Sequence, residues 1–182
     1  MEKNRCSWAN TKNKLYIDYH DSEWGIPVYN DHKLFEMLVL ESFQAGLSWE
    51  CILNKRQNFR KAFDNFSLEK ILNYDENKIT NLLSDEGIIR NKLKINAAIN
   101  NSKIFKEIQN EYGSFSKYIW SFTNNNVIYE IGETSSELSN KISNDLKKRG
   151  MKFVGTTIIY SYLQAVGIIY SHERNCFLYK SF

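Results

Sequence analysis

The sequence predicts an all-α fold made of many short helices. Apolar residues recur at helical spacing in one segment after another, and glycine, serine, asparagine or aspartate stands where these segments begin or end. The run VIYEI, at 127–131, is the only strand-like stretch, and no second strand is evident to pair with it. No repeat, low-complexity tract or linker divides the chain, so we expect one domain over residues 1–182.

The expected helices follow one another along most of the chain. Four of them begin at a side chain that can cap a helix N-terminus, namely Ser48, Ser67, Asp75 and Ser114. The expected spans are about 31–45, 48–63, 67–72, 75–87, 90–111, 114–122, 136–149 and 156–167. Residues 1–29 show little periodicity but carry many aromatic rings, so we expect this segment to pack onto the helices or to line a pocket.

Composition excludes several classes of protein. Apolar residues make up 42% of the chain, which is enough for a core. No apolar run approaches the ~18 residues of a membrane helix, and the first residues lack a signal-peptide core, so we expect a cytoplasmic protein with no membrane partner. Three cysteines far apart do not predict a disulfide framework. The net charge of +3 permits an anionic partner without requiring one.

An acid stands on an apolar helix face within residues 34–49, LFEMLVLESFQAGLSW. Leu34, Leu38 and Glu41 share one side of the expected helix because they are spaced by four and three residues. Burying an ionised carboxylate without a partner is costly, so a buried Glu41 would indicate a functional site. The alternative is a solvated Glu41 at the edge of an ordinary helix.

The same stretch predicts a tight turn with an exposed leucine. Gly46 ends the first helix, Leu47 follows in the turn, and Ser48 is a suitable N-cap for a helix that begins with Trp49. An apolar side chain and a large flat ring are thereby expected close to Glu41.

A second candidate site is the segment DLKKRGMKFVGTT at 145–157. Gly150 and Gly155 let the backbone approach a ligand, and the free N–H groups of the helix that begins at Thr156 attract an anion. Four basic residues surround this turn, so the segment is typical of a hairpin that grips a nucleic-acid backbone without reading sequence. An ordinary corner between two helices with a solvated basic face explains the same pattern. The basic residues are Lys147, Lys148, Arg149 and Lys152.

Two cysteines and two histidines form a possible metal site. Cys6 and His20 lie near one end of the chain, and His172 and Cys176 lie near the other with helical i, i+4 spacing. A Cys2His2 set suits tetrahedral Zn2+, which here would join the two ends and be structural. The alternative is four unrelated residues with reduced thiols.

Several aromatic residues accompany Glu41. Rings can stack on a flat heterocycle and attract a cation, and a carboxylate can accept its N–H groups and balance its charge. The set could therefore hold a flat, cationic heterocycle, whereas packing in the core is the alternative. The aromatic residues are Trp8, Tyr16, Tyr19, Trp24 and Trp49.

Six segments, in this order, together resemble bacterial 3-methyladenine DNA glycosylase I, a divergent family of helix–hairpin–helix DNA glycosylases. The segments are CSW, LYIDYHDSEWGIP, LFEMLVLESFQAGLSW, EGIIRNKLKINAAI, KKRGMKFVGTTIIYSYLQAVG and HERNC. The resemblance covers nearly the whole chain and implies a compact helix–hairpin–helix fold with a zinc clasp between the N- and C-terminal segments. The segment 123–134 and the tail after Cys176 have no clear counterpart.

The resemblance implies roles for the candidate residues. One structural zinc ion per chain would be held by Cys6, His20, His172 and Cys176. Glu41 would hold the extruded base and is the catalytic candidate, in a pocket with Tyr16, Tyr19, Trp49, Trp8 and Trp24, where Tyr19 and Trp49 sandwich the base. DNA contacts would come from Gly46, Leu47, Gly150, Lys152, Phe153, Gly155 and Thr156.

The implied reaction is hydrolysis of the N-glycosidic bond of 3-methyladenine, without strand cleavage. Many related glycosylases place an aspartate beyond the hairpin, and those that cleave the strand carry a lysine there. Residues 158–182 contain no aspartate, and Thr156 and Thr157 stand in the lysine region, so Schiff-base chemistry is not expected. The expected partners are alkylated double-stranded DNA and free 3-methyladenine as product. We expect a monomer, because bending DNA needs access to one face.

Three other functions fit parts of the sequence. A helix–hairpin–helix protein that binds DNA without chemistry would need the hairpin but not Glu41 among aromatic rings. A bifunctional glycosylase–lyase is disfavoured by the missing lysine and aspartate. A zinc-stabilised interaction protein would show no salt-dependent DNA binding. Substrate breadth, including 3-methylguanine, is left open by the sequence.

Overall fold

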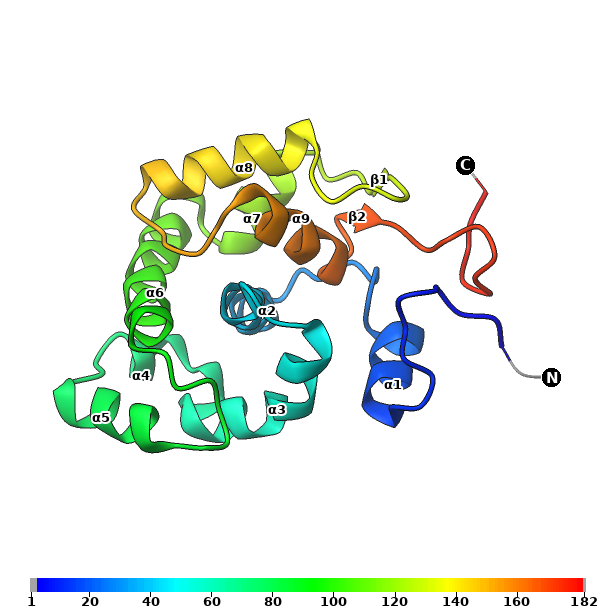
Figure 1. Cartoon of the computed structure of the whole chain (residues 1–182). Coiled ribbons are helices and arrows are strands. Elements are labelled where there is room, and N and C mark those ends of the chain that lie inside the picture. Colours follow the sequence, from blue (N-terminus) through cyan, green and yellow to red (C-terminus); the bar gives the residue numbers. More distant parts are fainter. Residues whose placement is uncertain (1–2, 182) are drawn as a thin grey trace.

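The computed structural model describes residues 3–181 and places the other helices around one buried helix, α2 (Asp31–Gln44). Figure 1 shows α2 end-on at the centre, with both chain ends on the side of α1. The other helices are α1 (Lys14–Ser22), α3 (Trp49–Ala62), α4 (Leu68–Ile71), α5 (Glu76–Ser84), α6 (Lys92–Tyr112), α7 (Phe115–Ser121), α8 (Glu137–Lys148) and α9 (Thr156–Ala165). The remaining elements are the short turn η1 (Asp64–Phe66) and the strands β1 (Ile128–Tyr129) and β2 (Ile169–Tyr170).

Helix α2 is central because its sequence is apolar on nearly every side. All residues from 34 to 43 are buried, and α2 packs against α3, α6, α7 and α9. A helix that is apolar all round is expected in a core rather than at a surface. Two acids are buried with it. Glu36 is neutralised by Arg56 and Arg60, each with a guanidinium nitrogen 2.8 Å from its carboxylate, whereas Glu41 pairs with no described cation.

The predicted all-α class is confirmed, and most helix boundaries lie within a few residues of the expected ones. Three predicted N-caps form the expected bond: Ser48 accepts from the Cys51 N–H, Asp75 from that of Lys78 and Ser114 from that of Lys117. Ser67 precedes α4 but makes no capping bond with its side chain.

Helix α1 lies within residues 1–29, where the sequence shows little periodicity and no helix was predicted. Asn13 caps it by accepting from the Leu15 N–H at 3.0 Å, and Tyr16, Tyr19 and His20 are its buried residues. The buried face consists of rings rather than aliphatic side chains, so the usual aliphatic signal of an amphipathic helix is missing.

The expectation that VIYEI has no partner strand is also wrong. Ile128 pairs with Ile169 and Tyr129 with Tyr170, in parallel. The partner is only two residues long and follows α9 directly, so it is too short to show alternation in the sequence. This pairing brings the loop after β1 to the same side of the molecule as the C-terminal tail.

Across residues 3–181, the helices are all too short or too polar to cross a lipid bilayer.

Candidate active site and metal centre

A cavity of about 430 Å³ opens between α1, α2, the start of α3, the loop after β1 and α9. Its walls include all six residues that the sequence grouped as a pocket, so the structure brings the predicted set together. The lining residues are Trp8, Tyr16, Tyr19, Trp24, Glu41, Gln44, Trp49, Ile131, Gly132, Glu133, Ser161, Gln164, Ser171 and Glu173.

Glu41 is the buried acid of this cavity. Its side chain is almost fully inaccessible, at 2% exposure, and Oε2 has no hydrogen-bond partner among the described residues. Burial raises its pKa from 4.5 to about 8, because nothing in its surroundings compensates the charged form. A buried acceptor without a partner is costly to a fold, so its position on a cavity wall indicates a ligand with N–H donors or positive charge.

Trp49 supplies a second unpaired polar atom to the same cavity. It is the first residue of α3, placed there because Ser48 caps the helix. Its Nε1 is buried and has no hydrogen-bond acceptor among residues 3–181. The cavity therefore presents one free donor and one free acceptor between aromatic walls.

The rings of Tyr19 and Trp49 lie against each other rather than apart. Their centroids are 5.2 Å apart and their planes are inclined by 44°. A base held between two parallel rings needs about 7 Å between them, twice a normal carbon contact. The two rings thus form adjoining walls, and a base sandwiched between them would require the rings to separate.

A tight turn presents Leu47 to solvent beside this cavity. Gly46 has a φ of +76°, a left-handed conformation that side chains other than glycine rarely adopt. Leu47 is 40% exposed, and its N–H donates to the Gln44 carbonyl at 2.6 Å. The predicted exposed leucine is therefore present, and its backbone is fixed.

The predicted hairpin connects α8 to α9. Gly150 has a φ of +100°, and the Met151 and Val154 side chains are buried, which anchors the turn to the core. Gly155 is the N-cap of α9, and no side chain satisfies the first N–H groups of that helix. These free donors leave an anion-binding end on the hairpin.

Two side chains of this segment, those of Arg149 and Thr156, already have partners within the protein. Arg149 already contacts the carboxylates of Asp145 and Glu111, at 2.8 and 2.6 Å. The Thr156 hydroxyl is 2.8 Å from that of Ser139. Lys152 remains exposed at the tip of the turn.

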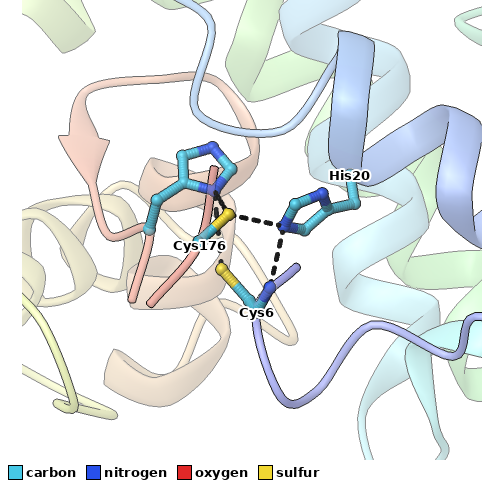
Figure 2. A group of neighbouring side chains, drawn as sticks. Cys6, His20 and Cys176 are labelled. Carbon is cyan, nitrogen blue, oxygen red and sulfur yellow. Dashed lines mark hydrogen bonds between the residues drawn. The ribbon is translucent and has the colours of Figure 1, made fainter. Parts of the chain in front are cut away.

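The four predicted metal ligands lie together at the junction of the chain ends. Cys6, His20, His172 and Cys176 are all buried, and one ligand atom from each lies within 4.8 Å of the others. Figure 2 shows Cys6, His20 and Cys176 converging. Cys6 Sγ is 3.5 Å from His172 Nδ1, and Cys176 Sγ is 3.5 Å from His20 Nε2. This group could hold a metal ion.

Two of the four residues have a shifted pKa, His172 toward the neutral ring and Cys6 toward the neutral thiol. Burial lowers the pKa of His172 to about 4 and, with Cys176 close by, raises that of Cys6 to about 12. Asp21 Oδ1 lies 2.8 Å from His20 Nδ1, which orients the ring so that Nε2 faces the thiols. A metal ion would supply the positive charge that favours the thiolate form of Cys6.

Sequence reasoning missed the wall of the cavity formed by the loop after β1 and by α9. The residues Ile131, Gly132 and Glu133 lie in the segment that had no clear counterpart, and their approach depends on the unforeseen pairing of β1 with β2. The helical spacing of Ser161 and Gln164 on α9 was available as a signal, but nothing marked that face as a cavity wall.

A family model described as methyladenine glycosylase matches residues 8–179. The chain belongs to the methyladenine glycosylase family. Among curated proteins, DNA-3-methyladenine glycosylase 1 of Escherichia coli (strain K12) is 42% identical across 96% of this chain and 96% of that protein.

Solved structures of similar proteins agree with this assignment. A crystal structure of a 3-methyladenine DNA glycosylase I has a TM-score of 0.93 and 40% identity, covering 97% of this chain and 100% of that one. Another glycosylase I, a variant in complex with 3-methyladenine, has a TM-score of 0.90 and 33% identity, covering 95% and 96%. The family fold therefore extends over nearly all of the described residues.

Proposed function

We propose that this protein removes 3-methyladenine from alkylated double-stranded DNA by hydrolysing its N-glycosidic bond, leaving an abasic site. The observation that carries the proposal is the unpaired, buried carboxyl of Glu41 on the wall of an aromatic cavity. Family membership and the complex of a similar glycosylase with 3-methyladenine support this choice of base.

The chemistry of the lesion suits this cavity. Methylation at N3 gives adenine a positive charge and weakens its glycosidic bond, so the base leaves as a neutral molecule and needs no strong acid. Before the bond breaks, the enzyme must extrude the base from the duplex and hold it in the cavity. Extrusion costs a few kcal/mol and is easier for a damaged pair. Glu41 accepts from the exocyclic amine and balances the charge, while the aromatic walls offer stacking and cation–π attraction.

The turn and the hairpin supply the contacts with DNA in this proposal. Leu47 fills the space that the extruded base leaves in the duplex. The free N–H groups at the start of α9, together with Lys152, bind backbone phosphates without reading sequence. Residues 158–182 contain no aspartate and Thr156 and Thr157 stand in the hairpin region, so we assign hydrolysis without strand cleavage.

We assign the metal site to a single structural zinc ion. Metal–sulfur distances of about 2.3 Å and metal–nitrogen distances of about 2.05 Å place neighbouring sulfur and nitrogen ligands of a tetrahedral zinc about 3.6 Å apart. The corresponding separations here are 3.5, 3.5 and 3.6 Å. Four protein ligands leave no open position, so the ion would hold the chain ends together rather than take part in the reaction.

The first experiment measures the release of free bases from methylated duplex DNA, separated by chromatography. We expect 3-methyladenine to appear while 7-methylguanine stays in the DNA, and we expect Glu41→Gln to lose most of this activity. Duplex binding without any released base would leave only a DNA-binding module. Sedimentation of the same sample tests the monomer that we propose, and cell fractionation tests its proposed location in the cytoplasm with the chromosome.

A further inference from the structure

We propose that Lys94 and Asn101, on one face of α6, are positioning residues that fix the distance between the Leu47 turn and the DNA-binding hairpin. In this arrangement, gripping the backbone at the hairpin places Leu47 where it can enter the duplex. The inference rests on the proposed function, because it assigns to α6 a role in base extrusion.

Lys94 secures the end of α2 just before the turn. Its Nζ donates to the carbonyls of Phe43 and Ala45, at 2.9 and 2.6 Å. These are carbonyls of the last turn of a helix, which have no partner within the helix and attract a cation. The turn of Gly46 and Leu47 follows directly, so this one ammonium group sets where the turn leaves the core.

Lys94 occupies an unusual environment for a lysine. The residue is only 8% exposed, and no carboxylate of the described residues forms an ion pair with it. Burial lowers its pKa, so keeping the charge there costs free energy. A lysine is rarely buried without a paired acid, and the carbonyls of α2 are the groups that account for its place here.

Asn101 secures the hairpin in a similar way. Its Nδ2 donates to the Lys152 carbonyl and its Oδ1 accepts from the Lys152 N–H, both at 2.8 Å. The preceding residue adds a bond from Asn100 Nδ2 to the Gly150 carbonyl, at 2.9 Å. Asn101 is 2% exposed, and its side-chain amide bonds to both the N–H and the carbonyl of Lys152, as a residue of a neighbouring β-strand does.

These two hydrogen bonds between Asn101 and Lys152 lie next to a strained backbone conformation at Phe153. Phe153 has a φ of +54°, which is unfavourable for a residue with a bulky side chain. Such a conformation persists only where neighbouring contacts determine it. Asn101 provides these contacts on the N-terminal side of Phe153, and the buried side chain of Val154 follows on the other.

The two anchors share a single rigid element. Lys94 and Asn101 are seven residues apart, so they lie on one face of α6 about 10.5 Å apart along its axis. Figure 1 shows α6 beside α2 and passing the connection between α8 and α9. Helix α6 therefore fixes the position of Leu47 relative to the hairpin.

The test compares Lys94→Met, which keeps the length of the side chain but removes the donor, with the conservative Lys94→Arg. Lys106→Met is the matched control, because Lys106 is exposed and lies three turns further along α6. Three quantities are measured: single-turnover release of 3-methyladenine from DNA, affinity for free 3-methyladenine by tryptophan fluorescence, and the fluorescence of 2-aminopurine placed next to the lesion, which reports unstacking.

We expect Lys94→Met to slow release about 10- to 100-fold and to abolish the unstacking signal, because small misplacements are costly for positioned groups. Its affinity for the free base should stay within about twofold, since Lys94 does not line the cavity. Lys94→Arg should recover most of the rate, and Lys106→Met should behave as the parent protein. Leu47→Ala should reproduce the Lys94→Met pattern.

The inference is overturned if Lys94→Met releases the base at the parent rate, or if it loses free-base affinity in proportion to rate, which would indicate a general structural defect. Lys94→Gln is used where the methionine variant does not fold, and an unchanged unstacking signal in that variant counts equally against the role. If the parent protein itself releases no base, the proposed function fails, whereas normal release by both proteins removes only the role of Lys94.

Discussion

Cys6, near one end of the chain, lies with its Sγ 3.5 Å from Nδ1 of His172, near the other end. The segment that begins at Cys6 carries Trp8, and α1 adds Tyr16 and Tyr19, all on the wall of the cavity. The joined chain ends therefore determine how well the base-binding wall is held in place.

Removing the metal should weaken both the fold and the base-binding site. We expect Cys6→Ser to bind none of the zinc that we propose for this site and to lower the melting temperature by several degrees, because ion binding stabilises only the folded chain. Affinity for free 3-methyladenine should fall as well, since the wall formed by α1 is no longer tied to the C-terminal tail. Elemental analysis measures the zinc content, thermal unfolding the melting temperature, and tryptophan fluorescence the affinity for the free base.

Cys51→Ser is the matched control for this prediction. Cys51 lies on α3, is half-buried and is not part of the four-ligand group. Its replacement should leave zinc content and free-base affinity unchanged. Zinc-free parent protein that binds the base normally would contradict the role of the clasp.

Glu41→Gln should make the protein more stable at high pH. In the folded chain the Glu41 pKa is raised to about 8 from 4.5, so the folded state holds this proton more tightly than the unfolded state. Stability of the parent protein therefore falls as pH rises from about 4.5 to about 8, by about 1.4 kcal/mol per pH unit at most. Glutamine does not ionise, so the variant should match the parent at pH 4 and exceed it by a few kcal/mol above pH 8.

Glu36→Gln should show the opposite sign. Lys33, Arg56 and Arg60 outweigh the burial of Glu36 and lower its pKa, so its ionised form contributes stability above about pH 4.5 that is lost on acidification. This variant should be less stable than the parent at pH 8, with a smaller difference at acid pH. Thermal unfolding across pH measures both variants, and a Glu41→Gln protein that is destabilised at pH 8 would disprove the unpaired state of this acid.

The same raised pKa should appear in the kinetics. The pH dependence of kcat/KM reports groups of the free enzyme, and the ionised form of Glu41 is the one that attracts a cationic base. We expect kcat/KM for 3-methyladenine release to rise with pH up to about 8. Residual activity in Glu41→Gln should lack this rise, and a profile shared by both proteins would assign the titration to another group.

Apart from α1, the helices could be predicted from sequence because their signals are local. Ser48, Asp75 and Ser114 cap their helices as expected, and the apolar spacing within each helix is visible without knowing its neighbours. The pairing of Ile128 with Ile169 was not predictable in this way, because two-residue strands far apart in sequence carry no periodicity. The burial of Glu41 was also undecided, since it depends on what α9 and the loop after β1 place over α2.

The chemistry of the site was likewise predictable only in part from the sequence. Residue types alone allowed a metal site and a cavity for a flat cation, but the identity of the base came from the resemblance to a family. Lys94 and Asn101 carried no signal, because a lysine and an asparagine in a helix are ordinarily solvated. Their partners are backbone atoms of other elements, which only the folded chain brings to them.

Lys152 and Arg149 should affect DNA binding differently, although both are basic residues at the hairpin. Lys152 is exposed, so Lys152→Ala should weaken binding to any duplex and reduce the slope of log affinity against log salt by about 1. Arg149 is engaged by Asp145 and Glu111, so Arg149→Ala should lower the melting temperature with little change in that slope. Fluorescence anisotropy at several salt concentrations separates the two, and equal slopes for Lys152→Ala and the parent would exclude a phosphate contact there.

Replacing Leu47 should impair extrusion of the base but not recognition of it. Leu47 is 40% exposed and is not among the residues that line the cavity. Leu47→Ala should therefore slow single-turnover release of 3-methyladenine from duplex DNA about tenfold or more, because the gap in the duplex is no longer filled. Affinity for the free base should be unchanged.

A substrate that needs no extrusion gives the control within the same variant. With the lesion in single-stranded DNA, the cost of unpairing is absent, so Leu47→Ala should recover most of the parent rate. Leu15→Ala, at a leucine that is 50% exposed on α1 and outside the cavity lining, should leave both rates unaltered. An equal loss on single-stranded and duplex DNA would mean that Leu47 acts on the cavity itself rather than on the duplex.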